Sequence, residues 1–276
     1  MTSHLNGIIL ESQNFRENDR VLIFYSQELG KVEILVRGAR KIKSKLNPFV
    51  SPFALLELVV APGKSFYHLI GGEVKKYFKG VSGDYKKIIQ ATNLFRRISV
   101  LINLHRPDPK ISVLLIRFLE KIDKIHPEKV QIIYYACLIK LLSLLGYRPE
   151  IKQCFDCRKD AKLLGENIYF DFEKGGICCF KCRENRISAV HPVRSSSEVF
   201  QDRESEGEVT FAALANLRNR DLRQTSNGVK INSRILEILH NLLYKNFDYL
   251  ENWHFDEKSF LAAQNIIKKF YRWHLK

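Results

Sequence analysis

Apolar and polar residues alternate with a period of two in several short runs within the first 80 residues of the chain. Such alternation over four to eight residues is typical of a half-buried β-strand. Four or five short strands at this spacing predict a small antiparallel barrel, and a small sheet packed on helices is the alternative. The runs cover residues 21–26, 32–36, 53–60 and 66–70, with turn residues at Gly30, Asn47-Pro48, Ala61-Pro62-Gly63 and Gly71-Gly72.

From Asp84 onward the apolar period changes to that of a helix. Apolar residues recur three or four positions apart between Ile88 and Ile102, which predicts an amphipathic helix. Residues 111–122 and 130–145 are apolar almost all round, so they are expected to be buried helices of a bundle. Cys137 lies inside the second of these and is interpreted as a small core residue.

A polar, acidic stretch at residues 195–208 is typical of a solvated linker or long loop. Helical patterns resume at residues 210–219, 233–249 and 257–274. The pattern predicts an α+β chain with four parts: a barrel at 1–80, the first part of a helical domain at 81–149, a cysteine module at 150–190, and a linker with C-terminal helices packing on the helical domain at 191–276.

Five of the six cysteines lie between residues 154 and 182. Two Cys-x-x-Cys knuckles, Cys154/Cys157 and Cys179/Cys182, are separated by 21 residues, which is the spacing of a four-cysteine zinc site. Four thiolates leave no open coordination position, so one structural zinc ion is expected rather than a catalytic one. Cys178 would give the poorer spacing Cys-x-x-x-Cys, so Cys179 is preferred as the third ligand and Cys178 is interpreted as a bystander. The alternative is reduced cysteines without metal.

The chain carries 45 basic and 30 acidic residues, a formal charge of +15, so a polyanion such as nucleic acid is the expected partner. The excess is spread over the whole chain rather than confined to one tail. One short stretch, residues 37–45, directly follows a predicted strand and contains five cations and no acidic residue. A loop of this kind at a barrel rim can neutralise several phosphates. Its five cations, the candidate nucleic-acid contacts, are Arg37, Arg40, Lys41, Lys43 and Lys45.

Aromatic residues near this loop are candidates for stacking on bases, although core packing is the simpler interpretation of any single one. They are Phe24, Tyr25, Phe49, Phe53, Phe66 and Tyr67.

No catalytic motif accompanies these features. Gly63-Lys64-Ser65 resembles the end of a phosphate-binding loop, but Leu58 stands where the leading glycine is required. The sequence contains no His-Glu-x-x-His and no Gly-x-Ser-x-Gly, so we expect a binding protein rather than an enzyme. No secretory signal and no apolar run of about 18 residues is found, which favours a cytoplasmic address without membrane contact.

Several short motifs, in a fixed order over residues 1 to about 192, resemble the bacterial recombination mediator family RecO. They are Gly7-Ile-Ile-Leu10, Arg16-Glu-Asn-Asp-Arg20, Gly30-Lys31-Val32, Val36-Arg-Gly-Ala-Arg40, Pro52-Phe53, Leu55-Leu56-Glu57-Leu58, Leu145-Gly146-Tyr147-Arg-Pro149, and the cysteine knuckles with Gly175-Gly176.

The resemblance implies an N-terminal OB-fold barrel followed by a helical domain with the zinc module. It implies binding of single- and double-stranded DNA, annealing of complementary strands, and action in DNA repair at the nucleoid. The implied partners are RecR, the acidic, apolar tail of single-strand-binding protein and, indirectly, RecA, which is loaded onto gaps. A basic, apolar pocket on the helical domain is expected for that tail, at a position that the sequence does not give.

Two other classes of protein compete with this interpretation. A zinc-dependent nuclease would need an open metal site or clustered carboxylates, and neither is found in the sequence. A zinc-ribbon transcription or translation factor is the remaining alternative, because it shares the cysteine spacing and the basic charge.

Overall fold

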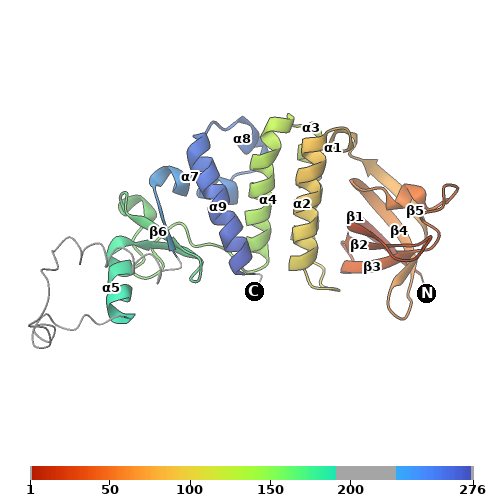
Figure 1. The fold of residues 1–276 in the computed structure, drawn as a ribbon, viewed down its shortest axis with the longest axis horizontal. Coiled ribbons are helices and arrows are strands. Elements are labelled where there is room, and N and C mark those ends of the chain that lie inside the picture. The colour runs from red at the N-terminus through yellow and green to blue at the C-terminus, as the bar shows by residue number, and fades with distance from the viewer. Residues whose placement is uncertain (1, 191–227, 275–276) are drawn as a thin grey trace, which may run out of the picture. The chain divides into compact units, whose positions relative to one another are not determined.

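The computed structural model describes residues 2–190 and 228–274 (Figure 1). Within these ranges the chain forms two compact units. One contains the described residues up to Arg148 together with Asn241–His254, and the other contains those between Pro149 and His240 and those from Phe255 onward. The linker expected at 195–208 and the helix expected at 210–219 lie outside the described residues. No helix within the described ranges is both long and apolar enough to cross a membrane.

The first unit begins with a closed five-stranded barrel of strand order β1-β2-β3-β5-β4 (Figure 1). Neighbouring strands are antiparallel except β3 and β5, which close the barrel in parallel. This closure is that of an OB-like fold, so the predicted small barrel is confirmed. The strands are β1 (Ser3–Asn14), β2 (Arg20–Ser26), β3 (Gly30–Val36), β4 (Ala54–Ala61) and β5 (Tyr67–Tyr77).

Alternate residues of the strands fill the interior of the barrel. In β4, Leu56, Leu58 and Val60 are fully buried while the residues between them are half-buried, which is the period-two pattern read from the sequence. The same alternation places Val32 and Ile34 of β3 inside. These side chains belong to one hydrophobic cluster that holds the five strands together.

The prediction of a turn at Gly71-Gly72 was wrong, because β5 runs without a break from Tyr67 to Tyr77. Gly72 instead allows two strands to lie close together. A Cβ atom at position 72 would lie 2.4 Å from the carbonyl oxygen of Glu57 on β4. The glycine therefore permits a close approach of two strand backbones rather than a turn.

Four helices follow the barrel directly, and α8 joins them from the C-terminal part of the chain. Asp84 and Asp108 cap α2 and α3 by accepting hydrogen bonds from backbone N–H groups. The bounds are α1 (Lys79–Ser82), α2 (Tyr85–Leu101), α3 (Pro109–Lys124), α4 (Val130–Leu144) and α8 (Phe247–Asn252).

The two apolar helices differ in burial. Nearly every residue of α4 is buried, as predicted. The expectation for α3 was wrong, because this helix buries only one face, which includes Leu115 and Phe118, and leaves Val113 46% exposed. Helix α3 is therefore amphipathic, and part of its apolar surface remains available to solvent.

The barrel packs on α2 and on the start of α3. The Tyr25 hydroxyl donates to the carbonyl oxygen of Asp108 at 3.3 Å. Lys31 Nζ donates to the carbonyl oxygen of Ser99 at 2.7 Å. The rings of Phe53 and Phe95 lie 6.3 Å apart between their centroids.

The second unit contains a three-stranded antiparallel sheet of order β7-β6-β8. Phe170 of β6 packs against Phe270 of α9 with ring centroids 5.7 Å apart. The helix predicted at 233–249 is divided into α7 and α8, because Asn246 caps a new helix. The bounds are β6 (Ile168–Asp171), β7 (Gly176–Cys179), α5 (Phe180–Val190), β8 (Gly228–Ile231), α7 (Ser233–Tyr244), which spans both units, and α9 (Glu257–Trp273).

Candidate nucleic-acid interface and metal centre

The basic loop, residues 37–45, leaves the barrel at the end of β3 and is held against the β1–β2 loop, residues 15–19. The Gly38 N–H donates to the Asp19 carboxylate at 2.8 Å, and the Arg40 N–H donates to the carbonyl oxygen of Asn18 at 3.0 Å. Ala39 between them is buried in the barrel core. The loop therefore has a defined position at the barrel rim.

All five predicted cations of the basic loop are exposed, and none of the ion pairs within the described ranges involves them. Arg40 also has a structural contact, since its Nη1 donates to the carbonyl oxygen of Glu17 at 2.8 Å. Ile42, at the centre of the loop, is 96% exposed. The arrangement presents positive charge to solvent without internal neutralisation.

Three of the six aromatic stacking candidates are buried, and Phe49 is partly buried against the barrel core. Phe24, Tyr25 and Phe53 are at most 6% exposed, so they cannot reach a base. Phe66, the last residue of the β4–β5 loop, and Tyr67, the first residue of β5, are half-buried. Sequence analysis missed Phe15, which is 45% exposed in the β1–β2 loop, because an isolated phenylalanine beside an arginine has no pattern of its own.

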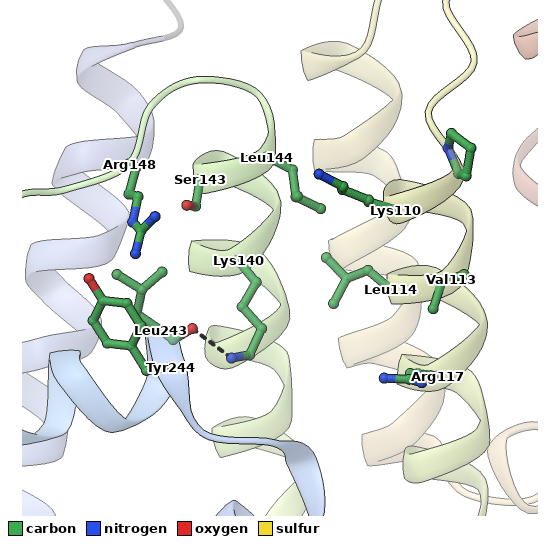
Figure 2. Close-up of a pocket in the computed structure, with 11 residues that line it drawn as sticks. Lys110, Val113, Leu114, Arg117, Lys140, Ser143, Leu144, Arg148, Leu243 and Tyr244 are labelled. Carbon is green, nitrogen blue, oxygen red and sulfur yellow. Dashed lines mark hydrogen bonds between the residues drawn. The ribbon is translucent and has the colours of Figure 1, made fainter.

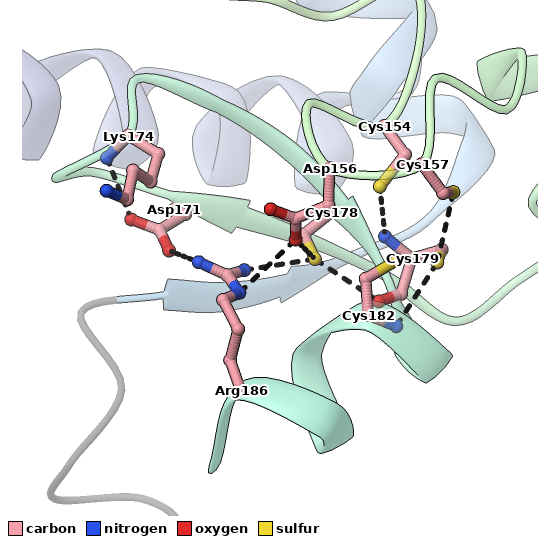
Figure 3. A network of polar contacts seen from close by, with 9 residues as sticks. All are labelled: Cys154, Asp156, Cys157, Asp171, Lys174, Cys178, Cys179, Cys182 and Arg186. Carbon is pink, nitrogen blue, oxygen red and sulfur yellow. Dashed lines mark hydrogen bonds and ion pairs between the residues drawn. The ribbon is translucent and has the colours of Figure 1, made fainter. Parts of the chain in front are cut away.

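The four knuckle cysteines converge in the second unit (Figure 3). The Sγ atoms of Cys154, Cys157, Cys179 and Cys182 all lie within 4.8 Å of one another, close enough to hold one metal ion. Cys179 ends β7 and Cys182 lies in the first turn of α5. Four sulfur ligands of this kind suit the tetrahedral coordination of zinc.

Backbone groups favour ionisation within this cluster. The Cys179 N–H donates to Cys154 Sγ at 3.4 Å, and the Cys182 N–H donates to Cys179 Sγ at 3.4 Å. Burial opposes ionisation of the Cys154 thiol, but hydrogen bonds from the N–H groups of residues 156, 157 and 179 outweigh it and lower the pKa of Cys154 to about 7. A thiolate is the form that binds a metal ion, so the lowered pKa favours Cys154 as a ligand, whereas burial and the neighbouring thiols raise the pKa of Cys182 in the same cluster.

Cys178 precedes Cys179 in β7 and also lies close to the cluster, since its Sγ is within 4.8 Å of Cys154 Sγ. Its Sγ lies 3.0 Å from Arg186 Nη2 and 3.4 Å from Asp156 Oδ2. Burial raises the pKa of the Cys178 thiol to about 12. With Cys154 and Asp156 it forms a second possible ligand set of three residues, but only Cys179 completes the set of four.

Arg186, which no sequence motif singles out, connects the parts of this module (Figure 3). Its Nε lies 3.2 Å from Asp156 in the first knuckle, and its Nη1 lies 3.2 Å from Asp171 of β6. Its guanidinium carbon is 4.7 Å from the centre of the Phe155 ring. The side chain thus ties α5 to both the first knuckle and the sheet.

A pocket of about 580 Å³ opens in the first unit between α3, α4 and the end of α7 (Figure 2). No acidic residue is among the described residues that line it. Apolar and basic side chains alternate around it: Val113, Leu114, Leu144 and Leu243 with Lys110, Arg117, Lys140 and Arg148.

Lys140 is the most buried cation of the pocket. Its Nζ donates to the carbonyl oxygens of Leu243 and Lys245 at 2.7 and 2.8 Å. Burial lowers the pKa of Lys140 to about 8. The pocket therefore combines an apolar lining with positive charge, which suits an apolar ligand carrying carboxylates.

Family models of known proteins match two successive parts of the chain. Two family models match it, "Recombination protein O N terminal" at residues 1–78 and "Recombination protein O C terminal" at residues 82–206. The first ends where the barrel ends, and the second includes α2 to α5 and the cysteine module.

Three curated relatives, each described as "DNA repair protein RecO", illustrate the similarity. The protein from Caldanaerobacter subterraneus subsp. tengcongensis is 29% identical over 64% of this chain and 70% of its own length. The one from Acetivibrio thermocellus is 28% identical over 67% of this chain and 72% of its own length. The one from Dehalococcoides mccartyi is 28% identical over 77% of this chain and 88% of its own length.

Proposed function

Because this chain belongs to the RecO family of DNA repair and recombination proteins, we propose that it binds single- and double-stranded DNA and anneals complementary strands. The observation that carries the proposal is the exposed, unneutralised basic loop at the rim of an OB-like barrel. Such a loop binds phosphates of either DNA form, because the phosphate backbone is common to both.

Annealing on this surface requires no covalent chemistry and no nucleotide. Two complementary strands repel each other through their phosphates, and cations that bind both strands reduce this repulsion. Base pairing then supplies the driving force. The hydrogen bonds from Gly38 and Arg40 to the β1–β2 loop support this mechanism, since they fix the position of the cations before DNA arrives.

A strand-annealing assay without ATP, scanned over salt, tests this function. Lys41, Lys43 and Lys45 are changed to alanine together, which leaves the structural contacts of Arg40 in place. Each phosphate contact contributes about 0.7 to the salt slope of single-strand binding, so the triple variant should lose about 2 from that slope. Changing Lys124, Lys162 and Lys258, which are also exposed, is the matched control and should leave the slope unchanged.

Intact strands that pair faster at low salt support the proposal. No acceleration by the wild-type protein, despite tight DNA binding, would contradict it. Shortened strands would indicate a nuclease instead.

We further propose that the pocket between α3, α4 and the end of α7 receives the acidic, apolar tail of single-strand-binding protein. Its alternating apolar and basic lining supports this assignment. A synthetic tail peptide should bind the wild-type protein, and Lys110→Ala with Arg117→Ala should weaken that binding about tenfold or more. Lys124→Ala, on the same helix outside the pocket, is the control. Equal binding by all three proteins would exclude the pocket.

In the same proposal, the protein acts with RecR at the nucleoid to help load RecA onto gaps coated by single-strand-binding protein. One zinc ion held by the four knuckle cysteines stabilises the cysteine module and takes no part in any reaction. The convergence of the four sulfur atoms supports this role.

A further inference from the structure

Two phenylalanines meet at the surface of the barrel, on the side that carries the basic loop. Phe15 is in the β1–β2 loop and Phe66 is in the β4–β5 loop, and their ring centroids lie 5.5 Å apart at an interplanar angle of 72°. Phe15 is 45% exposed, although its contact with Phe66 already covers part of the ring. The pair therefore presents an aromatic surface to solvent.

This aromatic surface and the basic loop are connected. Arg40 of the basic loop donates from its backbone and side chain to carbonyl oxygens of the β1–β2 loop, one to three residues after Phe15. The Phe15 N–H donates to the carbonyl oxygen of Asp19 at 3.1 Å, which closes the loop. The ring is thus held in place by the same contacts that position the cations.

One further cation lies beside the Phe15 ring, and another precedes Phe66 in the β4–β5 loop. The guanidinium carbon of Arg16 is 5.2 Å from the centre of the Phe15 ring, and Lys64 is exposed two residues before Phe66. In OB folds, the loops between strands 1 and 2 and between strands 4 and 5 contact oligonucleotides. Single-strand binders combine cations for the phosphates with aromatic rings on which bases stack.

We propose that Phe15 and Phe66 form a stacking site for an unpaired base of single-stranded DNA, with Arg16 and Lys64 contacting the adjoining phosphates. This inference rests on the proposed DNA binding and specifies which form of DNA the site recognises. A paired base inside a duplex has no free face to offer the ring. The site therefore adds affinity for single strands only, whereas the basic loop binds both forms.

The test compares three ligands of equal length and charge per strand: a single-stranded oligonucleotide, a duplex, and a single strand made of abasic residues. Phe15→Leu with Phe66→Leu removes the aromatic faces but keeps apolar side chains in contact. Tyr85→Leu is the control, because Tyr85 is 76% exposed on α2, away from these loops. Base stacking contributes about 5- to 150-fold per base, so a tenfold loss is a realistic expectation.

The wild-type protein should bind the normal single strand at least about tenfold more tightly than the abasic strand. The double leucine variant should lose this preference and keep its duplex affinity, while Tyr85→Leu retains both. Equal wild-type affinity for normal and abasic strands, or an unchanged preference in the double variant, overturns the stacking site. Both outcomes leave the proposed function intact, whereas failure of the wild-type protein to bind any of the three ligands overturns that function itself.

Phe15→Trp gives a second readout that does not depend on loss of binding. A tryptophan that stacks on a base is quenched, so single-stranded DNA should quench the added fluorescence of this variant relative to the wild-type protein. The duplex and the abasic strand should not. Equal quenching by all three ligands overturns the proposal.

Discussion

Adjacent cysteines in β7 provide a matched pair of variants that tests the metal centre. Cys179 Sγ lies 3.9 Å from Cys157 Sγ within the four-sulfur cluster. Cys178 Sγ instead contacts the guanidinium of Arg186 at 3.0 Å. Cys179→Ser and Cys178→Ser make the same chemical change at neighbouring positions, so the comparison shows which of the two thiols binds the metal.

The expected magnitudes differ because the two sulfurs have different partners. Structural zinc sites bind with an apparent free energy of about 10–16 kcal/mol, so an equal share for each of four ligands is about 2.5–4 kcal/mol. Losing Cys179 should therefore weaken metal binding by about two to three orders of magnitude. Cys178→Ser replaces a buried thiol by a smaller hydroxyl that contacts Arg186 less well. This change should lower the free energy of unfolding by about 1–3 kcal/mol and leave metal binding unchanged.

The assay is metal content of the purified proteins, followed by competition with a chromogenic zinc chelator and by thermal unfolding. The wild-type protein and Cys178→Ser should each carry one equivalent of zinc, and Cys179→Ser should release it at far lower chelator concentration. If Cys178→Ser loses the metal while Cys179→Ser retains it, Cys178 is the ligand and our assignment is wrong. A wild-type protein without metal, purified under reducing conditions, refutes the site altogether.

Three further predictions concern stability. Arg40→Ala should lower the free energy of unfolding by about 0.5–1.5 kcal/mol in a denaturant titration, because exposed carbonyl oxygens of the β1–β2 loop lose a side-chain donor, and an unchanged midpoint would contradict this role. Gly72→Ala should lower the melting temperature because its Cβ meets the oxygen of Glu57, whereas Gly71→Ala, with open space, serves as the control. Burial lowers the pKa of Lys140 to about 8 from its usual 10.5. Between pH 8 and pH 10.5 the unfolded chain therefore binds more protons than the folded chain, so the free energy of unfolding should rise with pH in that range. Denaturant titrations at pH 7.5 and 9.5 should show that Lys140→Met abolishes this rise.

Local periodicity was sufficient to predict much of the fold. Strand alternation identified β3 and β4, and an apolar stretch identified the buried helix α4, because burial imposes these patterns directly on the sequence. Gly72 was misread as a corner, because a glycine in sequence does not distinguish a turn from a close approach of two backbones. Helix α3 was misjudged because Val113 is apolar and yet exposed.

The candidate sites, like the fold, could be predicted only in part. The four-cysteine cluster could be predicted because its spacing reflects metal geometry. The role of Cys178 could not, since a strand of only four residues shows too little alternation to assign a face. The contacts of Arg186 and the pocket could not be predicted, because they are formed by residues far apart in the chain. The hydrogen bond from Lys140 to the Leu243 carbonyl is an example, and such contacts leave no local pattern in the sequence.

Strand β1 has a consequence for how the protein tolerates changes at its N-terminus. It pairs with β2 along Gly7–Asn14 and with β4 along Ser3–Ile8, so it joins strands on both sides. Truncation of the first ten residues would open the barrel and leave unpaired backbone donors and acceptors on β4 and part of β2. Exposed strand edges of this kind template intermolecular pairing. Even a short N-terminal deletion is therefore expected to make the protein aggregate through its sheet edges.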